Sequence, residues 1–232
     1  MGLFAALASF NRNSVLEHHL EKSLTWGHDT FGRNIFALTS LSFAGSFLET
    51  FFALTILFTF LMGSLAFMKS NSVFQGWIDW MSALPGTLIG IAVGTLFDST
   101  LKGIIVAAIF QLFPSLFRLA QGKVLQTHRQ PYYLSSVALG ASRQHLFFTY
   151  DIRIVLECFF GMGPHLCYRL ILLNATLCFL GTGSYPDYET WGQLVYQSRE
   201  YLIEAPWLIL GSGVPLLLTI WSFHLLSTKR SR

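Results

Sequence analysis

Long apolar stretches are the feature that most constrains how this chain can fold. A helix needs about 20 mainly apolar residues to cross the roughly 30 Å hydrocarbon layer of a membrane. Five stretches have this character, and they cover residues 43–68, 77–97, 101–119, 154–180 and 207–226. Backbone groups inside a bilayer must be paired internally, and these runs lack the two-residue alternation of membrane β-barrel strands. The sequence therefore predicts an all-α integral membrane protein with about five transmembrane helices.

The composition excludes the other broad classes of protein. Charged residues make up 12% of the chain, about half of the roughly 25% that is usual in soluble domains. The 22 phenylalanines argue against disorder, because disordered chains are poor in aromatic residues. The net charge of +3 is too small to indicate a nucleic-acid partner. The three cysteines all lie in the apolar stretch 154–180, so we expect free thiols there.

The distribution of charge predicts how the chain is oriented. Short cytoplasmic segments carry an excess of Lys and Arg. Residues 118–153 hold five basic residues against Asp151 alone, and the C-terminal tail holds three basic residues, whereas residues 181–205 hold four acidic residues against Arg199. We therefore expect an N-terminal extracytoplasmic segment (1–41), a transmembrane domain (42–228) with a cytoplasmic loop at about 120–153, and a basic cytoplasmic tail (229–232).

Two sets of residues inside the predicted spans are candidates for packing or for function. Gly86, Gly90 and Gly94 recur every four residues, a spacing that lets helices approach closely, either within the chain or at a subunit interface. His165 and Arg169 are four residues apart and share a helix face, with Glu157 roughly on the same face. A charge at this depth usually faces a cavity or a partner. These residues either line a translocation path, together with Asn174, or fix helix packing.

The long polar segment between the third and fourth spans has a pattern of its own. Pro131 can open a helix, residues 132–139 give two turns, and Gly140 can end them. A second amphipathic segment is expected over residues 142–148. Trp and Tyr side chains cluster near the outer interface, and an aromatic belt is expected to explain most of them, namely Tyr185, Tyr188, Trp191, Tyr196, Tyr201 and Trp207.

The motif Tyr-x-x-Ser-Ser-x-Ala-Leu-Gly-Ala-Ser at residues 132–142 resembles the EAA loop in permease subunits of bacterial ABC importers. Residues 27–36 are similar to the GTDxxGRDxxSR segment of the dipeptide, oligopeptide and nickel permeases. Residues 179–183, 191–194 and 205–208 are similar to that subfamily's FLGLGxxPPxxxWGxML and APW signatures. The three signatures occur in the same order over about residues 25–228.

The chain also departs from the family pattern. The glutamate that names the loop falls at Leu134. The family's later His-x-Leu-Pro motif falls near residues 150–153 without the proline. The family's first transmembrane helix has no counterpart, since the chain begins just before the segment at 27–36.

The resemblance implies a role for the loop and a set of partners. In the family the loop's glycine ends a coupling helix that sits in a groove of the ATPase subunit, and Gly140 matches that glycine. The resemblance thus implies a bacterial inner-membrane protein with a second permease subunit, two cytoplasmic ATPase subunits and a periplasmic or extracellular solute-binding protein. The implied ATPase-coupling residues are Tyr132, Ser135, Ser136, Ala138, Leu139, Gly140, Ala141 and Ser142.

The expected function follows from these motifs. The chain has no G-x-x-x-x-G-K-[ST] motif, so ATP hydrolysis must belong to a separate subunit. We expect a permease subunit that moves peptides or similar small solutes, with no enzymatic activity, cofactor or metal of its own. The alternative is a degenerate or non-transporting membrane scaffold, which Leu134 and the lack of the family's first helix motivate. The sequence does not name the substrate.

Overall fold

The structure is a computed structural model that describes residues 35–64, 72–97, 99–182, 190–199, 203 and 206–230. Every regular element in these residues is a helix, which confirms the predicted all-α class. In chain order the elements are α2 (Ile35–Ser64), α3 (Ser72–Ala83), α4 (Gly86–Leu96), α5 (Thr100–His128), α6 (Pro131–Ala138), α7 (Arg143–Leu146), the π-helix η2 (Phe147–Asp151), α8 (Ile152–Gly161), α9 (Gly163–Phe179), α10 (Trp191–Ser198) and α11 (Pro206–Arg230).

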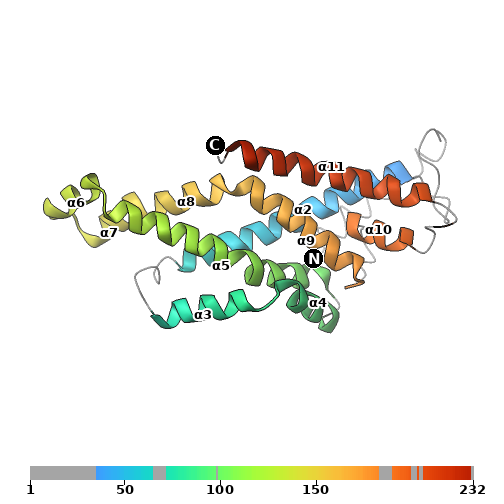
Figure 1. Ribbon diagram of the computed structural model, residues 1–232, viewed down its shortest axis with the longest axis horizontal. Coiled ribbons are helices and arrows are strands. Elements are labelled where there is room, and N and C mark those ends of the chain that lie inside the picture. Colours follow the sequence, from blue (N-terminus) through green and yellow to red (C-terminus); the bar gives the residue numbers. More distant parts are fainter. Residues whose placement is uncertain are drawn as a thin grey trace, which may run out of the picture.

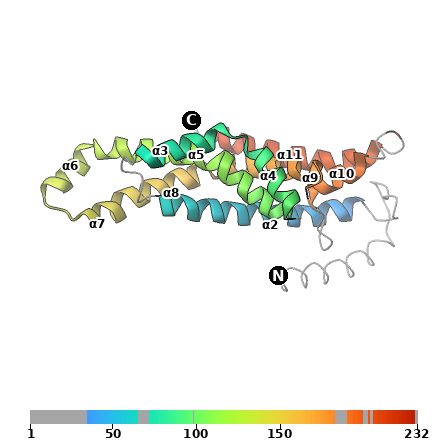
Figure 2. The same ribbon diagram turned by 90° about the horizontal axis from the view of Figure 1, so that it is seen from below.

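The helices form an elongated bundle with two different ends. The short helices α6 and α7 project at one end, and α10 lies near the other end beside the first half of α11 (Figure 1, Figure 2). Helix α5 runs from the middle of the bundle out to α6. The segment between α5 and α8 is therefore separated along the long axis from α10.

Among the described residues, three helices are long and apolar enough to cross a membrane, namely residues 36–64, 100–128 and 209–228. A fourth candidate is the pair 143–161 and 163–179, which is bent by 54°. These segments correspond to four of the five predicted spans. The chain is thus an integral membrane protein whose spans are helical.

The second predicted span, residues 77–97, is not one continuous helix. It is divided into α3 and α4, of 12 and 11 residues, and neither alone reaches the length of a span. The break falls at Pro85, which has extended backbone angles (φ −68°, ψ 108°). Proline has no N–H and disfavours the helical conformation of the residue before it, so the helix ends and a new one starts.

The glycines of α4 pack against α5 within the same chain. A Cβ atom on Gly90 would lie 2.6 Å from the Ala107 Cβ and 2.9 Å from the Gly103 carbonyl oxygen. A Cβ atom on Gly86 would lie 2.8 Å from the Ala107 carbonyl oxygen. This contact supports the intramolecular reading of the glycine repeat, since both glycines are covered by α5 in the isolated chain.

Helix α5 forms the centre of the bundle and extends past the predicted span. It buries a row of apolar side chains that includes Ile104, Leu112, Phe113 and Phe117. The predicted span ended at residue 119, but the helix continues to His128, because the polar residues after 119 are also compatible with a helix. The segment first expected to be a loop therefore begins as a helical extension.

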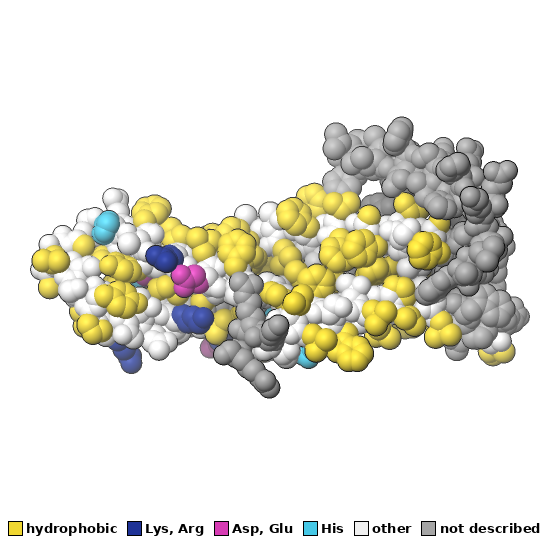
Figure 3. Space-filling view, turned by 90° about the horizontal axis from the view of Figure 1, so that it is seen from above, with side chains coloured by type: hydrophobic (Ala, Val, Ile, Leu, Met, Phe, Trp, Pro, Cys, Tyr) yellow, Lys and Arg dark blue, Asp and Glu magenta, His cyan; other side chains and the backbone are white. Residues whose placement is uncertain are grey.

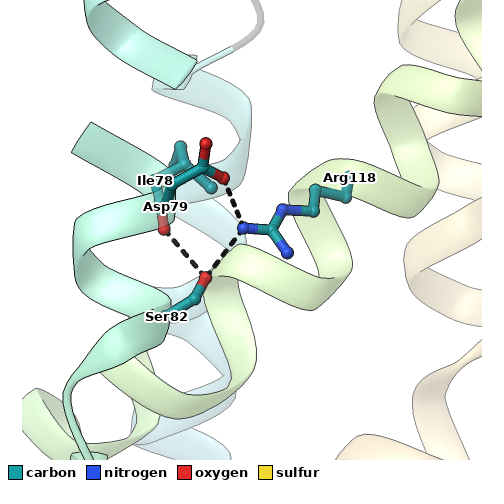
Figure 4. A network of polar contacts seen from close by, with 4 residues as sticks. All are labelled: Ile78, Asp79, Ser82 and Arg118. Atoms are coloured by element: carbon teal, nitrogen blue, oxygen red, sulfur yellow. Dashed lines mark hydrogen bonds and ion pairs between the residues drawn. The ribbon is translucent and has the colours of Figure 1, made fainter. Parts of the chain in front are cut away.

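Arg118, at the end of the predicted span 101–119 and the start of the basic stretch 118–153, lies in α5 and contacts α3. Its guanidinium Nη2 donates to Asp79 Oδ1 at 2.6 Å and to Ser82 Oγ at 3.0 Å (Figure 4). Ser82 in turn donates to the Ile78 carbonyl oxygen. Both charged side chains remain exposed, so this pair joins α3 to α5 at the surface.

The fourth predicted span is interrupted where α8 meets α9. Met162 ends α8 and precedes α9, and it lies between Gly161 and Gly163. Pro164 stands in the first turn of α9, where its missing N–H is tolerated. The glycines and the proline together account for the 54° bend.

Charged side chains are unevenly distributed on one face of the molecule. On the face seen in Figure 3, Lys, Arg, Asp and Glu side chains gather towards the end that carries α6 and α7, whereas hydrophobic side chains dominate elsewhere. Hydrophobic side chains are expected where a helix faces lipid, and charges where it leaves the bilayer. On that face, the end with α6 therefore has the character expected of a region outside the hydrocarbon layer.

Candidate functional site

Helix α6 has the start and the stop that the sequence predicts. Pro131 stands in its first turn, and the Gln130 carbonyl oxygen accepts from the N–H groups of Tyr133 and Leu134. At the end of the helix, Gly140 has φ +82°. Its N–H donates to the Val137 carbonyl oxygen at 3.0 Å, and the Ala141 N–H donates to the Ser136 carbonyl oxygen at 3.1 Å. This is a Schellman motif, whose left-handed position favours glycine. The prediction that Gly140 ends the helix is confirmed.

The second predicted segment, residues 142–148, does not form a separate helix. Ser142 caps α7 by accepting from the His145 N–H at 3.3 Å. Helix α7 then continues directly into η2 and α8. The result is one short helix, α6, held between two long helices by a turn at each side. We refer to residues 128–151 as the elbow.

The inner side of the elbow is closed by aromatic and charged side chains. The Tyr133 ring stacks on the His128 ring, with centroids 4.3 Å apart. His128 Nε2 lies 2.7 Å from Asp151 Oδ1, and Ser136 Oγ lies 2.9 Å from the Tyr150 hydroxyl oxygen. Burial, followed by the nearby Asp151 carboxylate, raises the pKa of Tyr133 above its ordinary value of 10.0. Tyr133 is therefore a neutral phenol at physiological pH.

Four large apolar side chains of the elbow, in α6 and at its C-terminal end, are exposed. We call this group the tip surface, and it consists of Tyr132, Leu134, Val137 and Leu139. Leu139 is 88% exposed, the most of the four. Residues 129–150 contain Arg129 and Arg143 but no acidic residue. An apolar group with basic neighbours, projecting from the end of a membrane protein, has the character of a contact surface.

Most of the predicted coupling residues are exposed on α6 or in the turn that follows it. Ser135 is exposed, and its hydroxyl donates to the Tyr132 carbonyl oxygen at 2.9 Å. Ala138, Gly140 and Ser142 are exposed, Ala141 is half-buried, and Ser136 faces inward to Tyr150. Leu134, at the position of the family's glutamate, belongs to the tip surface, so this surface has an apolar group where the family pattern has a charge.

The four predicted path residues do not come together. Glu157 is exposed on α8, where its Oε1 accepts from Arg153 Nε at 3.2 Å. His165 lies on α9, with Nδ1 3.3 Å from the Tyr168 hydroxyl oxygen. The bend between α8 and α9 separates Glu157 from the face that His165 shares with Arg169.

Arg169 and Asn174 have opposite environments on α9. Arg169 is exposed, and no carboxylate of the described residues pairs with it. Asn174 is buried, and its Nδ2 donates to Glu49 Oε2 at 2.6 Å across the contact between α9 and α2. Asn174 Oδ1 in turn accepts from the Cys178 thiol at 3.2 Å.

Sequence reasoning missed the partners of these residues. Glu49 is the one charge in the apolar stretch 43–68, and that isolation was a signal that it needs a polar partner. His224 of α11 contacts the Tyr168 ring, with centroids 5.3 Å apart, which brings a second histidine towards His165. Sequence periodicity describes one helix at a time, so the contact between His224 of α11 and Tyr168 of α9 can be seen only in the folded structure.

Two family-like motifs outside the elbow have structural roles. Gly181, at φ +80°, ends α9 in the same way that Gly140 ends α6. Trp191 is buried, and its Nε1 donates to the Thr39 carbonyl oxygen at 3.0 Å. Gly192 sits against α9, where an added Cβ would lie 2.7 Å from the Ala175 Cα. Trp191 is not one of the belt residues, because its side chain is buried in a cluster with Leu38 of α2 and Leu216 of α11.

Several predicted features lie outside the described residues. These are the segment 27–34, Tyr185, Tyr188 and Tyr201, and the acidic side chains Asp187, Glu189, Glu200 and Glu204. The cysteine prediction does fall within the described part, and Cys158, Cys167 and Cys178 are all free thiols there. Among the described side chains, no three His, Cys, Asp or Glu residues converge as a metal site.

Comparison with known proteins gives relatives of one kind. The chain is 26% identical over 218 residues to the dipeptide transport system permease protein DppC of Alkalihalophilus pseudofirmus, covering 87% of this chain and 68% of that protein. It is 29% identical over 148 residues to the glutathione transport system permease protein GsiD of Salmonella typhimurium, covering 64% and 49%. It is 25% identical over 210 residues to the probable D,D-dipeptide transport system permease protein DdpC of Escherichia coli K12, covering 86% and 69%.

These matches leave part of each relative uncovered. The chain spans about two thirds of the length of DppC and DdpC, and about half of GsiD. No protein-family model matches the chain. The relatives nevertheless agree in kind, and they confirm the resemblance found in the motifs. The chain is an integral membrane protein similar in sequence to dipeptide- and glutathione-type permease subunits of ABC importers.

Proposed function

We propose that this chain is a transmembrane permease subunit of an ATP-driven importer of peptides or similar small solutes. Its partners would be a second permease subunit, two cytoplasmic ATPase subunits and an extracytoplasmic solute-binding protein. The relatives that support this proposal are transport system permeases for dipeptides, D,D-dipeptides and glutathione. The cargo class is taken from those names, because all three kinds of cargo are small and peptide-like.

The single observation that carries the coupling role is the geometry of the elbow. Helix α6 projects from the end of the bundle, and the tip surface exposes four apolar side chains to whatever lies beyond. An ATPase that closes on nucleotide moves the surface that it presents to the membrane subunits, and a rigid element seated in that surface is displaced with it. The elbow is such an element, with one long helix leading into it and one leading out.

The orientation of the chain follows from the same proposal. The elbow and the C-terminal tail would be cytoplasmic, because both are basic, and α10 would lie on the outer side. Of the predicted path residues, His165 and Arg169 are the strongest. An exposed arginine without a carboxylate partner in the described chain is unfavourable in lipid, so it would face a polar path or the second permease. Glu157 is a weaker candidate because Arg153 already neutralises it.

The coupling role is tested by substitution at Gly140. A β-branched residue at φ +82° is strained by roughly 1–2 kcal/mol, although no neighbouring atom lies within 4 Å of an added Cβ. We expect Gly140→Val to weaken co-purification of ATPase subunits from membranes, or to lower substrate-stimulated ATP hydrolysis, without loss of the bundle. Gly122→Ala is the matched control, since Gly122 is exposed on α5 and also has open space.

The alternative is a scaffold that keeps the permease fold without transport, and Leu134 in place of the family's acidic residue favours it. The two functions differ in their complexes. A permease isolated from its native membranes is expected to bring an ATPase and a second permease with it. Recovery of neither from native membranes would favour the scaffold, as would a Gly140→Val variant that behaves like Gly122→Ala.

A further inference from the structure

A buried hydrogen bond between His128 and Asp151 connects the two helices on either side of α6, and the proposed docking of α6 does not itself require this bond. His128 is the last residue of α5 and Asp151 is the last residue of η2, so the pair joins positions 23 residues apart. The side chains are only 17% and 10% exposed. Because a carboxylate can only accept, His128 Nε2–H donates to Asp151 Oδ1 over the 2.7 Å between them.

Helix α6 is attached to this pair through two of its own residues. The Tyr133 ring covers the His128 ring, and its other neighbour is Tyr150, with ring centroids 5.5 Å apart. Ser136, one turn further along α6, lies 2.9 Å from the Tyr150 hydroxyl oxygen. The end of α5, α6 and η2 thus share one small cluster of side chains.

The π-helix explains how Asp151 reaches this cluster. Leu146 and Asp151 are five residues apart, and both are buried. In an α-helix with 3.6 residues per turn, two such residues point in directions about 140° apart. Hydrogen bonds between residues five apart bring them to one face, which is what η2 does over residues 147–151. The local distortion therefore aims Asp151 at His128 while Leu146 stays in the core.

We propose that His128 and Asp151 are positioning residues that lock the elbow into one rigid body. Arg129 and Gln130 join α6 to α5, and the turn at Gly140 joins α6 to α7. Tyr133 and Ser136 add side-chain contacts to both sides, and the hydrogen bond of the pair links the end of α5 directly to η2. With it, a displacement of α6 reaches α5 and α8 together instead of being absorbed at those turns. The role in transmission rests on the proposed function, whereas the lock itself is a property of this chain.

The lock is tested by hydrogen exchange on the full chain in lipid nanodiscs. Asp151→Ala removes the acceptor from a charge-assisted hydrogen bond, so amide exchange over residues 131–151 should become about ten-fold faster. The matched control is Arg153→Ala, which removes the exposed pair with Glu157 two residues away and should leave this exchange unchanged. The double variant His128→Asp with Asp151→His restores one acid and one base and should recover slow exchange. Equal exchange in Asp151→Ala and the parent would overturn the lock.

The role in transmission needs a second readout, taken in membranes that hold the native partners. Asp151→Ala should keep ATPase subunits bound to the tip surface but lower ATP-driven uptake of a dipeptide at least several-fold, and the double variant should restore it. If Asp151→Ala speeds amide exchange in the elbow but leaves uptake unchanged, the role in transmission is overturned, whereas the rigidity of the elbow still depends on the pair. If the parent chain recovers no ATPase, the proposed function fails and the role in transmission fails with it, but the exchange experiment still decides the lock.

Discussion

At the scale of single residues, the core of the bundle contains a chain of polar side chains. Asn174 donates to Glu49 and accepts from the Cys178 thiol, and the Thr190 hydroxyl donates to the Cys178 sulfur at 3.3 Å. These residues come from α2, α9 and the residue before α10. In a low-dielectric interior such bonds are strong, and an unpaired member is unfavourable. The network therefore fixes how three elements meet.

The first prediction concerns Glu49. Glu49→Ala leaves the buried Asn174 amide without this acceptor and should lower the free energy of unfolding by about 2–3 kcal/mol. Glu49→Gln keeps an acceptor of the same shape and should have a smaller effect. Thermal unfolding in detergent measures both, with Thr55→Ala, an exposed position on the same helix, as the control. A Glu49→Ala protein as stable as Thr55→Ala would show that the network contributes nothing.

The sequence predicts the role of a residue when that role depends on its neighbours in the chain, and not when it depends on a distant partner. The role of Gly140 could be predicted, because a glycine that follows two helical turns commonly ends a helix by adopting the left-handed conformation. Glu49 and Asn174 are 125 positions apart, and Trp191 donates to the backbone of Thr39, 152 positions away. Local pattern identifies such residues as unusual but contains no information on their partners, which is why Trp191 was placed at the interface when it is buried.

At the scale of elements, the glycines of α4 are spaced so that this helix packs closely against α5. Gly86 and Gly90 let α4 approach α5, and Gly103 of α5 is the reciprocal position, where an added Cβ would lie 2.6 Å from the Gly90 carbonyl oxygen. The repeat predicted close packing, but it did not distinguish a partner in the chain from a second subunit. Hydropathy does not indicate the break at Pro85, since both halves of the stretch are apolar, whereas the proline itself implies a kink there.

The second prediction tests this helix contact. Gly90→Val puts side-chain atoms where Ala107 and the Gly103 carbonyl oxygen already lie, so α4 and α5 must separate and the protein should lose about 1–3 kcal/mol of stability. Gly63→Val, in α2, meets no atom within 4 Å of the added Cβ and is the matched control. Thermal unfolding of the two variants in the same detergent makes the comparison, and equal midpoints would contradict the packing role of Gly90.

At the scale of the whole molecule, the two ends of the bundle should lie on opposite sides of the membrane. Leu139 in the elbow is 88% exposed, and Ile203, between α10 and α11, is 95% exposed. The elbow lies in the longer of the basic segments that predict the chain's orientation, and it is separated from α10 along the long axis (Figure 1). The sidedness can therefore be tested with one reporter at each end.

The third prediction uses these two positions. A membrane-impermeant thiol reagent should label Ile203→Cys in intact cells, and should label Leu139→Cys only after the membrane is opened. The parent chain, whose cysteines at 158 and 178 are buried, gives the background. Labelling of Leu139→Cys from outside would reverse the orientation and remove the elbow from any cytoplasmic partner.

The most direct measurement of the central claim is photo-crosslinking from the tip surface in membranes that hold the native partners. A photoreactive amino acid in place of Leu139 should give an adduct with a nucleotide-binding ATPase subunit, whereas the same residue in place of Ile203 should give none. Adducts from Leu139 that contain only lipid, or ATPase adducts from both positions in equal amount, would contradict the account of α6 as the ATPase contact.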